Sequence, residues 1–480
     1  MSEYVRFIQR IGLVGLTNIL ISLSSLIFIP IITKSFTTAE YGMWAQVNTT
    51  IALVPNIANL GLPYTMVRFL SAEKDKEKIK DSFYPMISLT FISTIILCTL
   101  FLIFGNIIAD TLFNGSMQVL YITTAISFFA SMNLMLITFF RTFQQMKRYS
   151  LFLVFQSYIG VFVSIYLTYA GYNIETVVLG LLTGYATVFI MMAFLILRYL
   201  GIGFGKWSNL KEQLAFAIPT IPSNVSSWVV DSSDKYVIGI LIGSVAVGCY
   251  SPGYALGSIL LMFLSPFAVL LPAILPEHYE KEDLAEVDKY LSYSMKYYLL
   301  LTVPAGVGMS VLSKPLLYII TTPEIALGGY MVTPFVCLGA IFMGIYGIIN
   351  NILILEKNTM ILGKLWIFVA ISNIVLNLLL VPYLNILGAA IATLLSYIIA
   401  FSVTTIASSK TMKLSFNIKD ILKIVIASAI MGVVVYNMKP DGIINVLISI
   451  LVGVIVYFAI IFILKAVTRK EIAIFKDLLH

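Results

Sequence analysis

The chain has 480 residues, of which 60% are apolar and only 11% are charged. This composition excludes a water-soluble globular protein, in which about a quarter of the residues are charged. The formal net charge of +7 does not indicate nucleic acid as a partner, because basic residues beside apolar segments orient membrane proteins and face anionic lipid headgroups.

Fourteen apolar segments are long enough to cross a bilayer as helices, which takes about 20 residues each. In chain order they are residues 11–33, 43–66, 85–106, 117–139, 151–170, 176–197, 213–232, 245–275, 293–313, 330–354, 361–382, 387–407, 421–437 and 443–464. No small-residue cleavage site follows the first segment, so we expect it to remain as a helix. The predicted fold is an all-α polytopic membrane protein with about fourteen transmembrane helices. Its connecting segments are too short for a separate soluble domain.

The basic residues lie almost entirely on one side of these segments. Of the 30 lysines and arginines, the other side receives only Lys34, Lys235, Lys314 and Lys439. The basic side of a membrane protein faces the cytoplasm. We therefore expect a multi-pass protein of the cytoplasmic (inner) membrane with both termini cytoplasmic, the segment 73–81 inside and the segment 321–329 outside.

An internal repeat relates the two halves of the chain. Residues 145–194 align with residues 357–406, which places Tyr185 on Tyr397, and the motif at residues 22–25 resembles the one at 224–227. The repeat pairs helices 1, 5 and 6 with helices 7, 11 and 12, and an even shift preserves orientation. The sequence predicts two six-helix lobes, 1–212 and 213–408, as parallel repeats around a central cavity. Residues 409–480 add two further helices and a cytoplasmic tail.

A set of short motifs resembles a known family. In order they are residues 28–44 (FIPIITKSFTTAEYGMW), 59–63 (NLGLP), 67–69 (VRF), 221–223 (IPS), 227–236 (SWVVDSSDKY), 248–250 (GCY), 377–383 (NLLLVPY) and 388–393 (GAAIAT). They resemble Wzx-type flippases of polysaccharide repeat units, such as O-antigen units. These flippases share the multidrug/oligosaccharidyl-lipid/polysaccharide (MOP) exporter superfamily with MATE exporters and lipid II flippases. The resemblance implies export of an oligosaccharide on a polyprenyl or dolichyl pyrophosphate from the cytoplasmic to the outer leaflet.

Five basic residues near the ends of the segments are candidates for contact with an anionic pyrophosphate, namely Lys34, Arg68, Lys235, Lys314 and Lys364. Ionisable groups within membrane segments are costly and are usually functional. The alternative is that these long side chains extend to the lipid headgroups.

Amide and hydroxyl side chains are candidates for contact with the sugar. They are Asn18, Ser22 and Ser25 in the first segment, Asn48, Asn56 and Asn59 in the second, Ser223, Asn224 and Ser227 in the seventh, and Asn373 and Asn377 in the eleventh. Spacings of three and four place such residues on one helix face. One interpretation is a polar cavity wall, and the alternative is hydrogen bonding between packed helices.

Asp231, Asp234 and Lys235 form the clearest acidic cluster near a segment, at the end of the seventh. Asp231 could accept H⁺ or Na⁺ and so bias two arrangements of the lobes. The alternative is an ion pair between Asp231 and Lys235, which lie one helical turn apart.

The missing motifs indicate a transporter rather than an enzyme. No Gly-rich phosphate loop followed by Lys and Ser or Thr is present, so we expect no direct use of ATP. We predict no catalytic residues, no metal site and no cofactor. The expected partners are the lipid-linked oligosaccharide, membrane lipids, a coupling ion, and a glycan polymerase with other assembly proteins.

Two other functions remain open from the sequence. A cation-coupled multidrug exporter of the MATE type would be expected to carry acids in excess of bases within the membrane, and such acids are scarce here. A membrane glycan polymerase or glycosyltransferase would need catalytic carboxylates in large outer loops, whereas the outer loops here are short.

Overall fold

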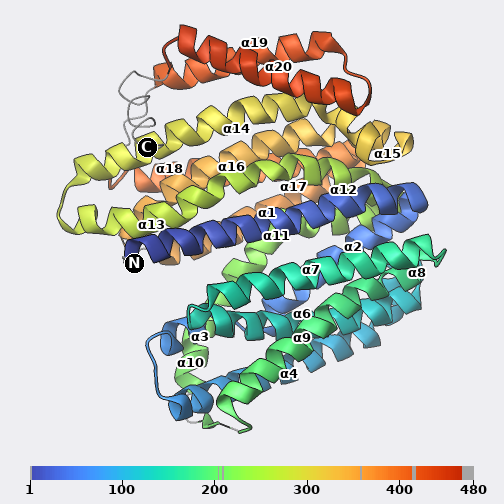
Figure 1. The fold of residues 1–480 in the computed structure, drawn as a ribbon, viewed down its shortest axis with the longest axis vertical. Coiled ribbons are helices and arrows are strands. Elements are labelled where there is room, and N and C mark those ends of the chain that lie inside the picture. The colour runs from blue at the N-terminus through green and yellow to red at the C-terminus, as the bar shows by residue number, and fades with distance from the viewer. Residues whose placement is uncertain (1–2, 204, 208–209, 357–358, 413–417, 467–480) are drawn as a thin grey trace. The chain divides into compact units, whose positions relative to one another are not determined.

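The computed structural model describes residues 3–203, 205–207, 210–356, 359–412 and 418–466 (Figure 1). Within these residues every regular element is a helix. The first eleven are α1 (Glu3–Ser35), α2 (Thr38–Ala58), α3 (Leu62–Leu70), α4 (Lys76–Ile103), α5 (Gly105–Leu112), α6 (Met117–Thr142), α7 (Met146–Tyr169), α8 (Ile174–Val177), α9 (Leu179–Leu200), α10 (Leu210–Ala217) and α11 (Ile221–Leu241). They are followed by α12 (Ser244–Ser258), α13 (Ser265–Glu280), α14 (Leu284–Ile320), α15 (Pro323–Gly329), α16 (Val332–Leu355), α17 (Thr359–Leu384), α18 (Ile386–Ser408), α19 (Ile418–Met438) and α20 (Gly442–Ile463). Two 3₁₀ turns, η2 (Ile218–Thr220) and η3 (Ile259–Leu264), complete the described elements.

The helices confirm the predicted all-α membrane fold. Among the described residues, 11 helical segments are long and apolar enough to cross a membrane, and each coincides with a predicted segment. The other three predicted segments fall on α2, α11 and α19, which are helical. Helix α11 is not among the 11 segments because Asp231, Asp234 and Lys235, which lie close together on it, lower its apolar character.

The described residues fall into two compact units, divided between Gly248 and Cys249. The predicted lobe boundary at residue 212 comes from the repeat and stays a prediction. In the structure, α11 packs against α2 and belongs to the N-terminal unit. The Gln46 side-chain amide donates a hydrogen bond to the Lys235 carbonyl at 2.7 Å, and the hydroxyls of Thr50 and Tyr236 lie 2.7 Å apart.

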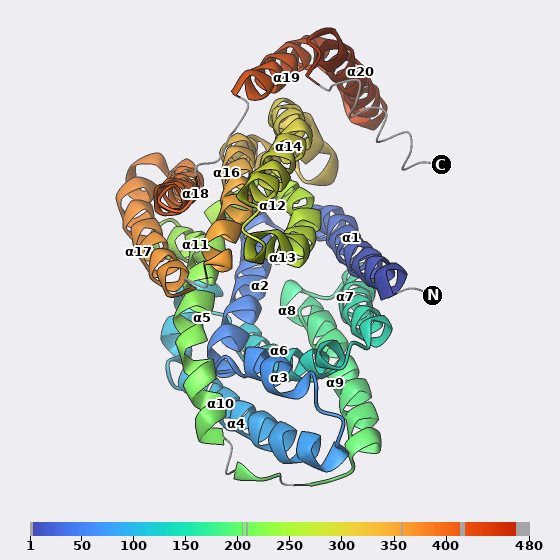
Figure 2. The same cartoon turned by 90° about the vertical axis from the view of Figure 1, so that its left-hand side faces the viewer.

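Helix α6 forms the centre of the N-terminal unit (Figures 1 and 2). Most of its membrane-length stretch is buried, because α2, α3, α4, α7 and α9 all contact it. Aromatic packing is extensive here, and the ring centroids of Phe83 on α4 and Phe139 on α6 lie 5.2 Å apart. Buried apolar side chains of α3, α4, α6, α7 and α9 pack in one cluster, which fixes the position of α3.

The predicted second segment, 43–66, is interrupted. Helix α2 begins with a capping box in which the Thr37 side chain accepts from Glu40 N, and it ends at Ala58. Leu60 and Gly61 then adopt left-handed backbone conformations, with φ of 50° and 74°. A Cβ on Gly61 would lie 2.2 Å from the Ala217 carbonyl oxygen, so the turn needs glycine for its conformation and for the close approach of α10. A single continuous helix was the wrong prediction for this segment.

In the C-terminal unit, α14, of 37 residues, packs against α16 and α19. Its Lys296 ammonium lies 3.2 Å from the Asp420 carboxylate of α19, and both side chains are largely buried. The pairs α17–α18 and α19–α20 run side by side (Figure 1). These contacts leave space between α14, α16, α18 and α19.

Candidate functional site

Helix α3 is short and strongly two-faced. Leu62, Thr65 and Met66 are buried, and the Thr65 hydroxyl donates to the Gln213 carbonyl of α10 at 3.3 Å. Tyr64 and Arg68, one turn apart, form the exposed face. Arg68 makes no hydrogen bond or ion pair with another described residue, so its guanidinium is available to an anion.

Tyr64, one helical turn before Arg68, links α3 to the predicted residue Asn224 of α11. The Tyr64 hydroxyl donates to the Asn224 side-chain oxygen of α11 at 3.1 Å. We name Tyr64, Arg68 and Asn224 the α3–α11 face. The sequence analysis missed Tyr64, although its spacing of four from Arg68 places both on one side of a helix.

The predicted acidic cluster on α11 is divided by burial. Asp234 is completely buried, and its carboxylate accepts from the Lys235 backbone N–H at 2.8 Å. Asp231 is half-buried, as are Asn224 and Ser227. The spacing of residues 224, 227 and 231 places these three on one face of the helix. Asp231, Asp234 and Lys235 all engage further partners.

The predicted polar face of α1 does not take part in its packing. Asn18 and Ser25 are exposed and Ser22 is half-buried. Contact with α7 uses Ser24 instead, whose hydroxyl lies 2.5 Å from that of Ser157. The face predicted to meet sugar is thus a polar surface that no neighbouring helix covers.

Two further predicted residues near the N-terminal end of α2 are exposed. Lys34 lies in the last turn of α1. Asn48 on α2 donates to the Trp44 carbonyl of its own helix at 2.9 Å, which leaves its side-chain oxygen exposed.

Asn373 and Asn377 are both completely buried in the C-terminal unit. The Asn373 amide donates to the Ser396 hydroxyl of α18 at 3.1 Å, and the Asn377 amide donates to the Asn373 side-chain oxygen at 3.1 Å. This arrangement favours the alternative interpretation for this pair, hydrogen bonding between packed helices.

A cavity of about 240 Å³ lies within the N-terminal unit between α2, α6, α7 and α9. We name it the amide pocket, because Asn56, Asn133, Gln156 and Tyr185 contribute its polar groups. Of these four residues the sequence analysis selected Asn56 for contact with the sugar, but not Asn133, Gln156 or Tyr185. Each is a single polar residue on a separate helix, so no spacing within one segment reveals them.

A larger cavity of about 590 Å³ lies in the C-terminal unit between α14, α16, α18 and α19. Its lining is apolar apart from the Ser310 hydroxyl and the Cys337 thiol, and includes Leu299, Val303, Val307, Phe342, Phe401 and Val425. We name it the apolar groove. It provides no charge and is suited to a hydrocarbon chain.

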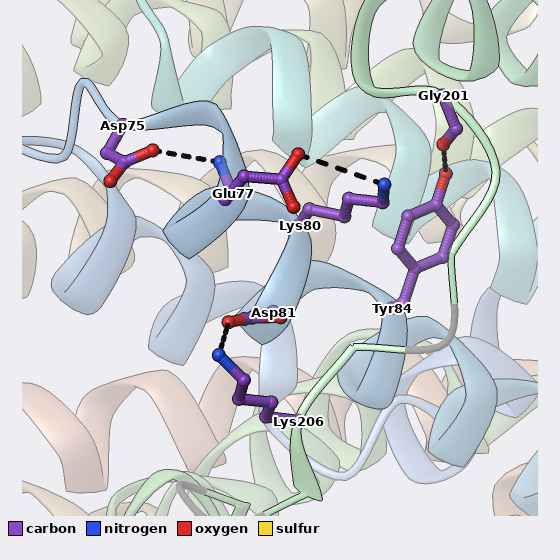
Figure 3. Close-up of polar contacts among 7 residues, drawn as sticks. All are labelled: Asp75, Glu77, Lys80, Asp81, Tyr84, Gly201 and Lys206. Atoms are coloured by element: carbon purple, nitrogen blue, oxygen red, sulfur yellow. Dashed lines mark hydrogen bonds and ion pairs between the residues drawn. The ribbon is translucent and has the colours of Figure 1, made fainter.

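The segment after α9 is attached to the N-terminal end of α4 (Figure 3). The Lys206 ammonium lies 2.8 Å from the Asp81 carboxylate, and the Lys206 backbone N–H donates to the Asp81 carbonyl at 3.0 Å. The Tyr84 hydroxyl donates to the Gly201 carbonyl (Figure 3). Hydrogen bonding to Asp81 and its charge raise the pKa of Lys206. These contacts hold the chain that leads into α10, the helix that supports α3.

The fold and these sites define a multi-pass α-helical membrane protein of the transporter type. Residues 7–276 match the model of the family described as "Polysaccharide biosynthesis protein", and the chain belongs to that family. Residues 219–379 match the MatE family model.

One relative and several solved structures are similar to this chain. A probable low-salt glycan biosynthesis flippase, Agl15 of Haloferax volcanii, is 22% identical over 280 residues. That match spans 57% of this chain and 58% of the relative's length. Among solved structures, the lipid II flippase MurJ in an inward closed conformation has a TM-score of 0.77 at 21% identity, covering 98% of this chain and 100% of that one. An inward-facing MATE family multidrug resistance transporter has a TM-score of 0.65 at 15% identity, covering 82% and 96%. At these identities the likeness establishes the fold.

Proposed function

We propose that this protein is a flippase that moves a lipid-linked oligosaccharide from the cytoplasmic to the outer leaflet of the cytoplasmic membrane. The product would serve synthesis of a surface polysaccharide or glycan. Membership in the polysaccharide biosynthesis family supports this proposal, as does the similarity to Agl15, a probable flippase of glycan biosynthesis. Both termini would be cytoplasmic, and glycan-assembly proteins would receive the cargo outside.

The observation that carries the proposal is the exposed cationic face of α3 in the N-terminal unit, and the apolar groove of the C-terminal unit supports it separately. The cargo has an anionic pyrophosphate, a hydroxyl-rich glycan and a long apolar tail. Arg68 offers a guanidinium that no described residue pairs, and such a group binds phosphate oxygens in a bidentate manner. Tyr64 and Asn224 add hydrogen-bonding groups beside it.

The apolar groove has the properties needed for the tail. Its volume of about 590 Å³ lies in the usual range for small-ligand sites, roughly 300–1,000 Å³. Because this volume is small for a whole polyprenyl chain, we expect the groove to hold one segment of the chain while the rest stays in the bilayer.

Translocation would follow alternating access, in which the cargo site opens first to one leaflet and then to the other. Ion binding at α11 would bias the two states, since Asp231 and Asp234 lie within a membrane helix where their charge is costly. We assign no chemical step to this protein, because moving the lipid requires neither bond making nor bond breaking.

The experiment is flipping in reconstituted vesicles that contain the full-length protein and a fluorescent polyprenyl-pyrophosphate sugar. A membrane-impermeant quencher reports the fraction in the outer leaflet. Faster exchange than in protein-free vesicles is the expected result. Exchange no faster than in protein-free vesicles, by a correctly folded protein, would contradict the proposal.

A second candidate function is the export of small amphipathic cations by a MATE-type mechanism. The MatE match over residues 219–379 and the buried Asp234 favour it. Efflux of a cationic dye from the same vesicles, with no movement of the lipid-linked sugar, would select this candidate instead.

A further inference from the structure

The amide pocket contains a buried acceptor with no partner. Asn133 is only 4% exposed. Its side-chain N–H groups donate to the Gln156 side-chain oxygen and to the Tyr185 carbonyl oxygen, both at 2.9 Å. Its own Oδ1 has no hydrogen-bond partner among the described residues. A buried acceptor left without a partner costs about 1–3 kcal/mol, so a residue in this state at a cavity suggests a ligand that donates to it.

Three other polar groups at the pocket also have hydrogen-bonding capacity to spare. Gln156 uses its side-chain oxygen, and its Nε2 makes no hydrogen bond with another described residue. The Tyr185 hydroxyl likewise makes none. Asn56 uses its Nδ2 on the Ala52 carbonyl at 2.8 Å, which leaves its Oδ1. The pocket therefore combines acceptors, a donor, and a hydroxyl that can do both.

The lining of the pocket carries no charge. Every described residue around it is either neutral and polar or apolar, the apolar ones being Ile51, Ala52, Pro55, Ala130, Leu134, Ile137, Phe152, Leu153, Val188 and Met192. Such a lining offers no counter-ion to a pyrophosphate and no carboxylate to a cation. It suits a neutral molecule with a polar edge and an apolar face.

A sugar ring has these properties, because its hydroxyl or amide substituents lie at the edge and its C–H groups form the faces. The volume of about 240 Å³ lies just below the roughly 300–1,000 Å³ that is usual for sites of drug-sized ligands. That limits the occupant to a single sugar residue rather than a whole oligosaccharide.

A short stretch of chain joins the amide pocket to the α3–α11 face. Asn56 lies in the last turn of α2, and Tyr64 and Arg68 follow on α3 after the turn at Gly61. Between them, Asn59 is 2% exposed and its side-chain oxygen and nitrogen have no partner among the described residues. Polar groups thus continue along the chain from the pocket to Arg68.

We propose that the amide pocket binds one neutral hydroxyl- or amide-bearing sugar residue of the lipid-linked cargo, with Asn133, Gln156 and Tyr185 as specificity-determining residues. This inference rests on the proposed flippase function. It divides recognition between two places in one unit: Arg68 binds the charge and the amide pocket selects the sugar.

The test compares two lipids on the full-length protein in lipid nanodiscs. One is a polyprenyl pyrophosphate that carries a single N-acetylglucosamine, and the other is the same polyprenyl pyrophosphate without sugar. Tyr185→Phe removes only the hydroxyl and keeps the ring. The matched control is Tyr158→Phe on α7, whose hydroxyl donates to the Leu20 carbonyl of α1 and lies outside the pocket.

We expect the wild-type protein to bind the sugar-bearing lipid more tightly than the sugar-free lipid. Tyr185→Phe should weaken binding of the sugar-bearing lipid by about 3- to 10-fold, as for the loss of one hydrogen bond, and should leave the sugar-free lipid unchanged. Gln156→Leu should act in the same direction. Tyr158→Phe should change neither dissociation constant.

Equal weakening of both lipids by Tyr185→Phe would overturn the inference, because it would indicate a structural role. Unchanged affinity for the sugar-bearing lipid would also overturn it. A wild-type protein that flips this lipid but shows no effect of Tyr185→Phe refutes only the sugar pocket. A wild-type protein that moves no lipid-linked sugar refutes the proposed function itself.

Discussion

The hydroxyl of Tyr64 on α3 donates a hydrogen bond to the side-chain oxygen of Asn224 on α11, over 3.1 Å. These residues are 160 positions apart in the sequence, and the contact joins the short helix after the Gly61 turn to α11, which carries Asp231, Asp234 and Lys235. Arg68 lies one turn further along α3, on the same exposed face. A cargo that binds Arg68 would therefore approach the Tyr64–Asn224 hydrogen bond, and its own hydroxyl groups could bind these two side chains instead.

We predict that Arg68 matters more to transport than the basic segment after it. Arg68→Ala should reduce delivery of glycan to the outer surface at least tenfold while the protein level stays normal, because a charge-assisted contact is lost. Lys74, Lys76 and Lys78 are exposed, and neutralising all three should have little effect on transport. Surface glycan can be measured by lectin binding to intact cells. Equal losses from the two changes would mean that Arg68 is only an orientation charge.

Gly61 is predicted to be intolerant of any side chain. Gly61→Ala should lower the stability of the folded protein by about 1–3 kcal/mol, because alanine is strained at positive φ, and its Cβ would also press on the backbone of α10. Thermal unfolding in detergent measures the change. Gly15→Ala on α1 is the control, since no atom lies within 4 Å of an added Cβ there. Similar melting temperatures for both variants would rule out the tight turn.

Ion coupling through α11 gives a prediction with two separable outcomes. If Asp231 carries the coupling ion, Asp231→Asn should stop cycling while cargo binding stays intact. If Asp231 pairs with Lys235 instead, adding Lys235→Gln should restore what the single change loses, because an unpaired buried charge is the costly state. Flipping assays with and without a proton or sodium gradient distinguish these. Full wild-type activity without any gradient would exclude coupling and leave downhill flipping.

Loss of the charge on the buried Asp234 should destabilise the folded protein more than loss of the charge on Asp231. Its carboxylate accepts the Lys235 backbone N–H, and Asp234→Asn would replace a charge-assisted bond by a neutral one. We expect lower protein yield and a lower melting temperature for Asp234→Asn than for Asp231→Asn. The reverse order would show that burial does not decide the roles of the two acids.

The membrane topology follows from the basic residues and can be tested directly. A single cysteine at Lys76 should resist impermeant maleimide in intact cells, and a cysteine at Glu324 should react. Cys98, Cys249 and Cys337 must first be replaced. Labelling of the Lys76 position from outside would overturn the orientation.

The positions of the helices could be predicted from the sequence, but the points at which they are interrupted could not. Long apolar segments predict membrane helices because the bilayer demands internally bonded backbone. Because the prediction considers the apolar character of a whole segment, it missed the turn at Leu60 and Gly61, where a local left-handed conformation interrupts an apolar stretch. The signal was present in the Gly61 and Pro63 pair, since proline favours the first turn of a new helix.

The candidate site could be predicted only where its residues share one helix. Arg68 and Asn224 were selected singly, and Tyr64 was missed because its contact joins two helices. Asn133, Gln156 and Tyr185 were missed for the same reason, since packing of α6, α7 and α9 brings them together. Asn377 shows why spacing alone left two interpretations open, because its burial beside Asn373 favours hydrogen bonding between packed helices over a cavity wall.

The attachment of α11 to α2 has a consequence for dividing the chain into co-expressed fragments. A break after residue 212 would separate Gln46 from the carbonyl of Lys235 and Thr50 from the hydroxyl of Tyr236. A break at Gly243 would keep both bonds within the first fragment, and an added Cβ at that turn meets no atom within 4 Å. We therefore expect co-expressed fragments divided at Gly243 to reassemble more readily than fragments divided after residue 212.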